Sequence, residues 1–352
     1  FHRTSWKFER HANWLQLPRE SDFYIIDQTH IDHARFAYLT ADRRIVGDSG
    51  VIFAATNTGF IPILHPSSLS WTYLLGPNAP NDGVVLAQLK VGNRLYVGTN
   101  GGTFAIFDVS SPGAAVLLGS VDAGDPVWDI ALIDTNAVLA QGPGGLGLVD
   151  VSNPANPSML IGGWGGGLNP NWATRVRTVG NRIYSSRGNT LRVHDLTALL
   201  TFVNVAEIPI GDWIVDIAID GTRCVVATDG SGIVTLEITA GGLLEKGRLT
   251  AFAFPREIRI AGNIAWIAAS EDGLAAIDIG NLAAPVALGS KKFKKDANSI
   301  ILNGNEAVVA LGDVVLVSVN IVNPAAMTLN SPEQTASFNI PMADRRAFLN
   351  AR

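Results

Sequence analysis

The stretch that decides the fold is GLGLVDVSNPANPSMLIGG, residues 145–163. A short apolar run ends at Asp150, prolines follow at positions 154 and 157, and a second apolar run ends in glycines. An aspartate that leaves a strand accepts backbone N–H bonds in a turn, and the prolines cannot extend a sheet ladder. The stretch therefore predicts two short strands joined by a stiff turn.

The same pattern returns along the chain with a period near 42 residues. Similar apolar runs end at His65, Asp108, Asp150, Asp195, Glu237, Asp278 and Ser318, at spacings of 43, 42, 45, 42, 41 and 40 residues. Before each of these runs lie two more, joined by a tight turn, as in GNRLYVGT (92–99) and VWDIALI (127–133). Each unit thus offers four short strands. Four antiparallel strands, repeated seven times, predict an all-β chain folded as a seven-bladed β-propeller.

The motif also resembles a known repeat. GLGLVDVSNPANP is similar to the LVIVD-type propeller repeat, and so are DGLAAIDIGNLAAP (272–285) and GTFAIFDVSSPGAA (102–115). The pattern covers residues 36–330, although His65 and Ser318 depart from the usual aspartate. Such repeats are commonly found in bacterial exported or cell-surface proteins. The resemblance therefore implies a propeller and a secreted, periplasmic or cell-surface location, and it supplies no reaction.

The repeats divide the chain into three parts. We expect the propeller over 36–335, an N-terminal extension over 1–35 that packs on or closes the ring, and a C-terminal tail over 336–352. Either DFYIID (22–27) or TASFNI (336–341) is expected to add the strand that closes the ring, because an open ring leaves two sheet edges exposed. The chain opens FHRTSWKFER, without Met, and we expect a processed or trimmed chain.

Composition narrows the classes of partner. The chain has 352 residues, is 47% hydrophobic and carries a formal net charge of −5. Its only basic cluster spans 291–295, so no nucleic-acid partner is expected. No apolar run approaches the length of about 18 residues that a transmembrane helix needs. The single cysteine, Cys224, lies in an apolar run and predicts a buried, inert thiol.

No motif identifies a cofactor or a metal site. The chain has no usable P-loop, dinucleotide-binding glycine loop, zinc-protease helix or serine-hydrolase motif. His30, Asp32 and His33 are the only close group of possible ligands, and they have no third histidine or cysteine partner. We therefore expect no metal centre, and the cofactor is left unassigned.

The innermost strand of each unit carries a polar position. The residue five places before the tight turn reads, in successive units, Ala87, Asp129, Arg175, Asp216, Glu257 and Ser299. Buried ionisable groups must pair, hydrate or bind something. In one interpretation they form a ring of salt bridges that fixes how the blades pack. In the other, Asp129, Asp216 and Glu257 act as general acid and base, and Arg175 holds an anionic group.

Aromatic side chains accompany this polar position. Trp172, Trp213 and Phe254 each lie three residues before it, and Trp128 directly precedes Asp129. Aromatic rings beside charges suit a sugar, a quaternary ammonium or an apolar ligand, although packing between blades explains them as well. The approach loops add Asp125, Asp212 and Arg256. Together these residues predict a ligand site at the top face, the end of the ring where the inner strands begin.

Three functions fit these residues. The first is a non-catalytic binding propeller, exported or on the cell surface, that engages a protein or a polymer such as a carbohydrate through its top face. The second is a lyase, hydrolase or isomerase that acts on a sugar-like or hydrophobic small molecule in the central top pocket. The third is a lectin or calcium-dependent adhesin. The sequence leaves the oligomeric state open.

Overall fold

The computed structural model describes residues 45–47, 51–55, 60–64, 72–73, 84–111, 115–164, 173–230, 232–252, 254–312 and 315–330. These residues all belong to one unit, 42–352, while residues 1–41 form a second unit outside the described ranges. Within the described residues every regular element is a strand, and the strands form seven antiparallel sheets of four strands each. The prediction of four short antiparallel strands per repeat is confirmed.

We number these sheets 1 to 7 along the chain. The inner strands are β1 (Ile45–Gly47), β5 (Val85–Val91), β9 (Asp129–Ile133), β13 (Val176–Val179), β17 (Ile214–Asp220), β21 (Glu257–Ala261) and β25 (Ala297–Asn303). The second strands are β2 (Val51–Ala55), β6 (Arg94–Thr99), β10 (Asn136–Ala140), β14 (Arg182–Arg187), β18 (Arg223–Thr228), β22 (Ile264–Ala268) and β26 (Glu306–Leu311). The third strands are β3 (Phe60–Leu64), β7 (Thr103–Asp108), β11 (Leu146–Asp150), β15 (Thr190–Leu196), β19 (Gly232–Thr239), β23 (Leu274–Asp278) and β27 (Val315–Asn320). The outer strands are β4 (Thr72–Tyr73), β8 (Val116–Asp122), β12 (Ser158–Trp164), β16 (Phe202–Pro209), β20 (Gly242–Leu249), β24 (Val286–Lys291) and β28 (Thr328–Leu329).

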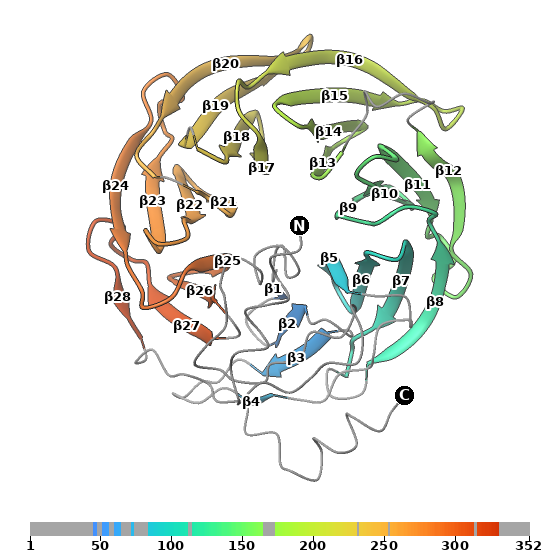
Figure 1. Ribbon diagram of the computed structural model, residues 1–352, viewed down its shortest axis with the longest axis horizontal. Coiled ribbons are helices and arrows are strands. Elements are labelled where there is room, and N and C mark those ends of the chain that lie inside the picture. The colour runs from blue at the N-terminus through green and yellow to red at the C-terminus, as the bar shows by residue number, and fades with distance from the viewer. Residues whose placement is uncertain are drawn as a thin grey trace, which may run out of the picture. The chain divides into compact units, whose positions relative to one another are not determined.

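The sheets stand around a central axis, with their inner strands toward the axis and their outer strands at the rim (Figure 1). The apolar core lies between neighbouring sheets, since each core cluster draws on two of them. The two ends of the series also meet, because Ile45 and Ile52 of sheet 1 pack with Ile301 and Val308 of sheet 7. The unit is an all-β β-propeller with four-stranded antiparallel blades. Sheets 2 to 7 are described with nearly all their side chains, and sheet 1 mainly through its backbone.

The antiparallel order fixes two ends of the ring. At one end the inner strands begin and the second strands turn into the third, and we call this end the top. At the other end the third strands turn into the outer strands. The GLGLVD-type runs therefore end at the bottom, away from the mouths of the inner strands.

The bottom turns are held by the aspartates that close the third strands. Asp150 Oδ1 accepts a hydrogen bond from Ser152 N at 2.8 Å. Hydrogen bonds from the Ser152 hydroxyl and from its backbone N lower the pKa of Asp150. Asp108 and Asp278 make the same bond, to Ser110 N and Gly280 N. The structural role predicted for these carboxylates is confirmed. Asp195 differs, because it pairs with Arg182 at 3.0 Å.

The proline-containing turn packs on the preceding sheet. A Cβ added at Gly119, in the outer strand of sheet 2, would lie 2.7 Å from Pro154 O and 2.8 Å from Pro157 Cδ. Gly247 and Gly289 meet the corresponding turns of the next sheets equally closely, at 2.6 Å from Leu282 O and 2.9 Å from Pro324 O. The motif quoted first therefore joins neighbouring blades, and it needs a glycine in the outer strand that receives it.

One detail of the repeat register was wrong. The sequence pattern ends the last third strand at Ser318, but β27 continues to Asn320, which pairs with Glu306 as Asp150 pairs with Asn136. Asn320 Oδ1 also accepts the turn bond, from Val322 N at 3.0 Å. Asparagine carries the same acceptor as aspartate, so the turn forms without the charge.

The expectations for the chain ends stay open. The last sheet takes its fourth strand from Thr328–Leu329, directly after β27. The segments 22–27 and 336–341, the extension 1–35 and the tail 336–352 lie outside the described residues.

Candidate functional site

The inner-strand carboxylates reach across to the next sheet. Asp129 Oδ2 accepts a hydrogen bond from Val176 N of sheet 4 at 3.1 Å. Asp216 Oδ2 accepts one from Ile258 N of sheet 6 at 3.0 Å. The bond repeats one sheet further on, from Ile300 N to Glu257 Oε2 at 3.1 Å. The same kind of hydrogen bond, from a backbone N–H to an inner-strand carboxylate, therefore joins three pairs of neighbouring sheets.

Ser299 closes this series between the last sheet and the first. Its hydroxyl oxygen accepts a hydrogen bond from Ile45 N at 3.0 Å and donates to Glu257 Oε2. Ser299 and Asp216 are fully buried, and Asp129, Arg175 and Glu257 are at most 5% exposed. In the described residues these bonds join sheet 3 to sheet 4, and sheet 5 through sheets 6 and 7 to sheet 1. We call them, together with the arginine contacts that join sheets 4 and 5, the relay.

Two arginines balance the buried carboxylates. Arg177 donates from Nη1 to Asp129 Oδ2 at 2.6 Å and from Nη2 to Asp216 Oδ1 at 2.7 Å. Arg259 pairs with Glu257, and its Nη1 lies 3.8 Å from Asp216 Oδ2. Sequence reasoning missed both arginines. Both arginines stand two residues after the inner polar position, and residues i and i+2 of a strand lie on the same face. This spacing could have identified them as neighbours of the buried carboxylates.

Arg175 is brought to the same network from the top of β13. Its Nη1 donates to Thr174 O at 2.8 Å, and its Nε lies 3.9 Å from Asp216 Oδ1. The structure therefore brings together the four residues of the predicted acid–base set, either directly or through Arg177 and Arg259. In this arrangement the carboxylates serve as acceptors for backbone N–H groups and guanidinium groups, and a proton-transfer role would require some of these contacts to break.

The predicted aromatic residues fall into two environments. Trp213 is 48% exposed and Phe254 is 52% exposed, and within the described ranges they are the exposed aromatic side chains. Both lie at the top, where β17 and β21 of neighbouring sheets begin. Trp128 is partly buried, and its indole lies against Gly142, where a Cβ would come within 2.8 Å of Nε1. Trp172 lies outside the described residues.

Phe254 has an unusual backbone. Its φ of 56° lies in the left-handed region, which a bulky residue rarely adopts. Ser270 Oγ donates to Phe254 O at 2.9 Å and accepts from Arg256 Nε at 3.0 Å, so the predicted site residue Arg256 supports the strained segment. Strain of this kind amounts to about 1–3 kcal/mol and is concentrated at functional segments.

The two predicted loop aspartates shape the top turns. Asp212 Oδ1 accepts a hydrogen bond from Trp213 N at 2.7 Å, which positions the backbone that carries the exposed indole. Asp125 covers the turn at Gly144, where a Cβ would clash with its carboxylate. Both aspartates are partly exposed.

The remaining reactive groups do not converge. Among the described residues no three His, Cys, Asp or Glu side chains are grouped so that they could hold a metal ion, and His30, Asp32 and His33 lie outside these residues. Cys224 is fully buried, and burial raises the pKa of its thiol to about 12. No helix in the described ranges is long and apolar enough to cross a membrane.

Comparisons with known proteins agree with the fold. The model of the LVIVD repeat matches residues 90–123, 124–161, 255–291 and 294–334. No curated protein matches the chain.

Several solved structures are similar in fold at low sequence identity. The computationally designed Ika8 protein is 13% identical with a TM-score of 0.57, over 78% of this chain and 82% of that chain. The Cps50 (Swd1) β-propeller domain of Myceliophteria thermophila is 10% identical with a TM-score of 0.61, over 82% and 95%. A chain of the Mitotic Checkpoint Complex is 12% identical with a TM-score of 0.63, over 77% and 84%. With its four-stranded blades and these matches, the chain is a β-propeller protein that carries LVIVD repeats at four positions.

Proposed function

We propose that the seven sheets form a seven-bladed ring that acts as a non-catalytic binding scaffold and engages a partner through its top face. The proposal rests on one observation: the predicted site residues lie in two different environments. The buried carboxylates hold neighbouring sheets together, while Trp213 and Phe254 remain exposed at the mouths of two adjacent inner strands. Exposed aromatic side chains on a rigid frame are typical anchors of a binding surface.

The strain at Phe254 supports the same interpretation. A glycine would adopt a φ of 56° without strain, yet the chain places an exposed phenylalanine there. Burial does not explain that choice, whereas contact with a partner would. We extend the proposal to a protein or carbohydrate partner and to an exported or cell-surface location, which rests on the LVIVD resemblance. One chain of the same fold belongs to the Mitotic Checkpoint Complex, and is thus part of an assembly.

The test compares top-face variants with a matched control. We expect Trp213→Ala combined with Phe254→Gly to abolish capture of the partner from extracts and binding to a glycan array. The control is Leu244→Ala, in outer strand β20, whose side chain is 51% exposed, and it should bind like the parent protein. Because Phe254→Gly relieves strain, this single variant should also unfold at a free energy higher by about 1 kcal/mol. Equal binding by the double variant and the parent would overturn the proposal.

A further inference from the structure

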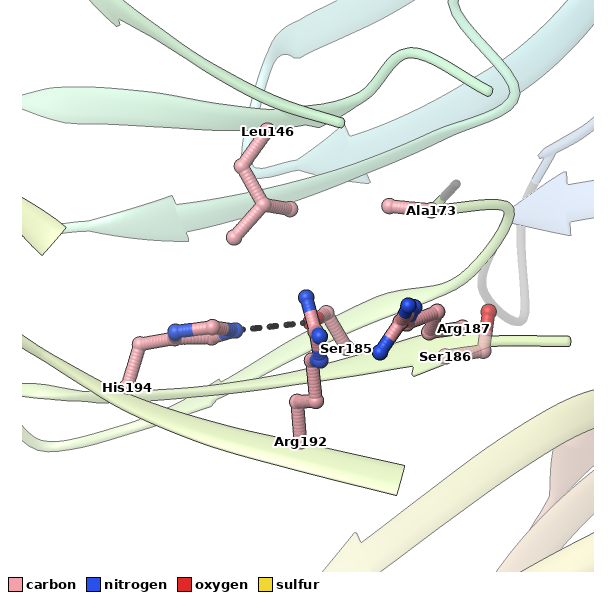
Figure 2. A pocket seen from close by; sticks show the side chains of 7 residues that line it. All are labelled: Leu146, Ala173, Ser185, Ser186, Arg187, Arg192 and His194. Carbon is pink, nitrogen blue, oxygen red and sulfur yellow. Dashed lines mark hydrogen bonds between the residues drawn. The ribbon is translucent and has the colours of Figure 1, made fainter. Parts of the chain in front are cut away.

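A small cavity lies between sheets 3 and 4 near the top, and its polar lining comes from sheet 4. Its volume is about 10 Å³, roughly the room that one water molecule needs. Leu146 and Ala173 form the apolar part of the lining. The polar part comes from strands β14 and β15, and Figure 2 shows these side chains: Ser185, Ser186, Arg187, Arg192 and His194.

The repeat itself shows that this lining is exceptional. Ser185 pairs with Arg192 across β14 and β15. At the same register the other sheets with described side chains have only apolar pairs: Val97 and Ala105, Leu139 and Gly147, Val226 and Val234, Ile267 and Ala275, and Val309 and Val317. Among the sheets whose side chains are described at this register, only sheet 4 places a hydroxyl and a guanidinium where the others pack apolar side chains.

The neighbouring positions depart from the repeat in the same way. His194 occupies a position that is Phe107, Val149, Leu236, Ile277 or Val319 in the other described sheets. Arg187 follows Ser186 where the other sheets have an uncharged residue: Thr99, Gln141, Thr228, Ala269 or Leu311. Burying polar groups lowers stability unless they are paired or serve a ligand, so four coordinated departures on one face call for a cause beyond packing.

Of the two arginines that line the cavity, only Arg192 has an ion pair among the described residues. Its Nε lies 2.9 Å from Glu207 Oε1. The guanidinium of Arg187 has no ion pair or hydrogen bond with any residue that the structure describes, and its backbone pairs with Thr190 in the sheet. Figure 2 shows the side chains of Arg187 and Arg192 directed toward one another. Burial lowers the pKa of Arg192, and the positive charge of Arg187 lowers it further. Two guanidinium groups that face each other across a cavity attract an anion.

We propose that this cavity, with Arg187, Arg192 and Ser185, is a binding site for a single carboxylate group. One carboxylate oxygen matches the water-sized cavity, and the second oxygen points to the partly exposed Arg187 at the top. Arg187 and Arg192 donate charge-assisted hydrogen bonds. The Ser185 oxygen lies 3.1 Å from His194 Nε2, and its hydroxyl donates to the carboxylate when His194 carries its proton on Nε2. Trp213 and Phe254 do not line the cavity, although the Trp213 ring lies 3.5 Å from the Cβ position of Gly188, the residue after Arg187. The carboxylate site does not depend on the proposed top-face function.

The test uses acetate as the probe and acetamide as its uncharged counterpart, at pH 7 and constant ionic strength. We expect saturable heat in calorimetry and a rise in the melting temperature with acetate, and neither with acetamide. Arg187→Gln should weaken acetate binding at least tenfold. The matched control, Arg182→Gln in the same strand, removes a charge that is paired with Asp195 outside the cavity and should bind acetate like the parent.

Further arms separate the sources of the carboxylate. A blocked tripeptide with a central Glu, compared with its Gln form, reports whether the site accepts a side-chain carboxylate. Binding of the Glu peptide and acetate assigns the site to acidic peptides, and binding of acetate alone assigns it to free small acids. The absence of saturable acetate binding, or unchanged binding by Arg187→Gln, would overturn the proposal and leave a cavity that holds water.

Discussion

At the scale of the residue, the histidine beside the cavity makes stability depend on pH. Burial, aided by the charge of Arg192, lowers the pKa of His194 to about 4, while an unfolded histidine titrates near 6.5. The folded state therefore binds fewer protons between these values, and its stability is complete above pH 6.5 and falls as the pH drops toward 4. We expect this residue to account for about 3 kcal/mol of the loss.

The variant His194→Leu tests this prediction, because leucine occupies the same position in sheet 5 as Leu236. The free energy of unfolding in urea, measured from pH 7 to pH 4, should fall less steeply in the variant than in the parent. When the free energy of unfolding of the variant is subtracted from that of the parent at each pH, the contribution of all other titrating groups cancels. Parallel curves would show that His194 is not neutral and buried as described.

Asp216 tests the relay between sheets at the same scale. Its carboxylate is fully buried and serves Ile258 N and Arg177 together. Asp216→Ala leaves Ile258 N without this acceptor and Arg177 with Asp129 as its remaining carboxylate, and we expect the free energy of unfolding to fall by about 3–5 kcal/mol. Asp220→Ala is the control, because its pair with Arg223 is partly exposed to solvent and is worth about 1 kcal/mol or less. An equal cost in both variants would contradict the structural role of the relay.

At the scale of the element, the proline turn of one sheet packs directly on the outer strand of the preceding sheet. Gly119→Ala places a methyl group 2.7 Å from Pro154 O, so the turn must shift, and we expect a loss of about 1–3 kcal/mol. Gly162→Ala, in outer strand β12, is the matched control, because no atom lies within 4 Å of its Cβ position. Thermal unfolding of the two variants checks the prediction, and similar melting temperatures would show that the turn does not depend on close contact.

The elements also show why one register was misjudged. The last four residues of VVLVSVN (314–320) alternate between apolar and polar, so both Ser318 and Asn320 lie at positions where the third strand could end. Pairing with Glu306 and the bond from Val322 N select Asn320. Sequence spacing located the strand, whereas the partner strand decided its last residue.

At the scale of the whole molecule, periodicity alone predicted the propeller, the four strands of each blade and the buried inner polar position. Each of these follows from local spacing, which the chain repeats many times. The cavity between sheets 3 and 4 could not be foreseen in this way. Its residues look unremarkable in sequence, and they become a site only because packing brings Arg187 and Arg192 against Leu146 of another sheet. The arginines of the relay, Arg177 and Arg259, were missed for a similar reason, since their partners belong to neighbouring sheets.

The buried thiol described above has a practical consequence for all of these experiments. Cys224 is the only cysteine of the chain, and at neutral pH its thiol stays protonated and shielded from reagents. We therefore expect this chain of 352 residues to react little with maleimides. A single cysteine introduced at any exposed site on the top face would accept one fluorophore, and the dye would report partner or carboxylate binding without removal of any native side chain from the core.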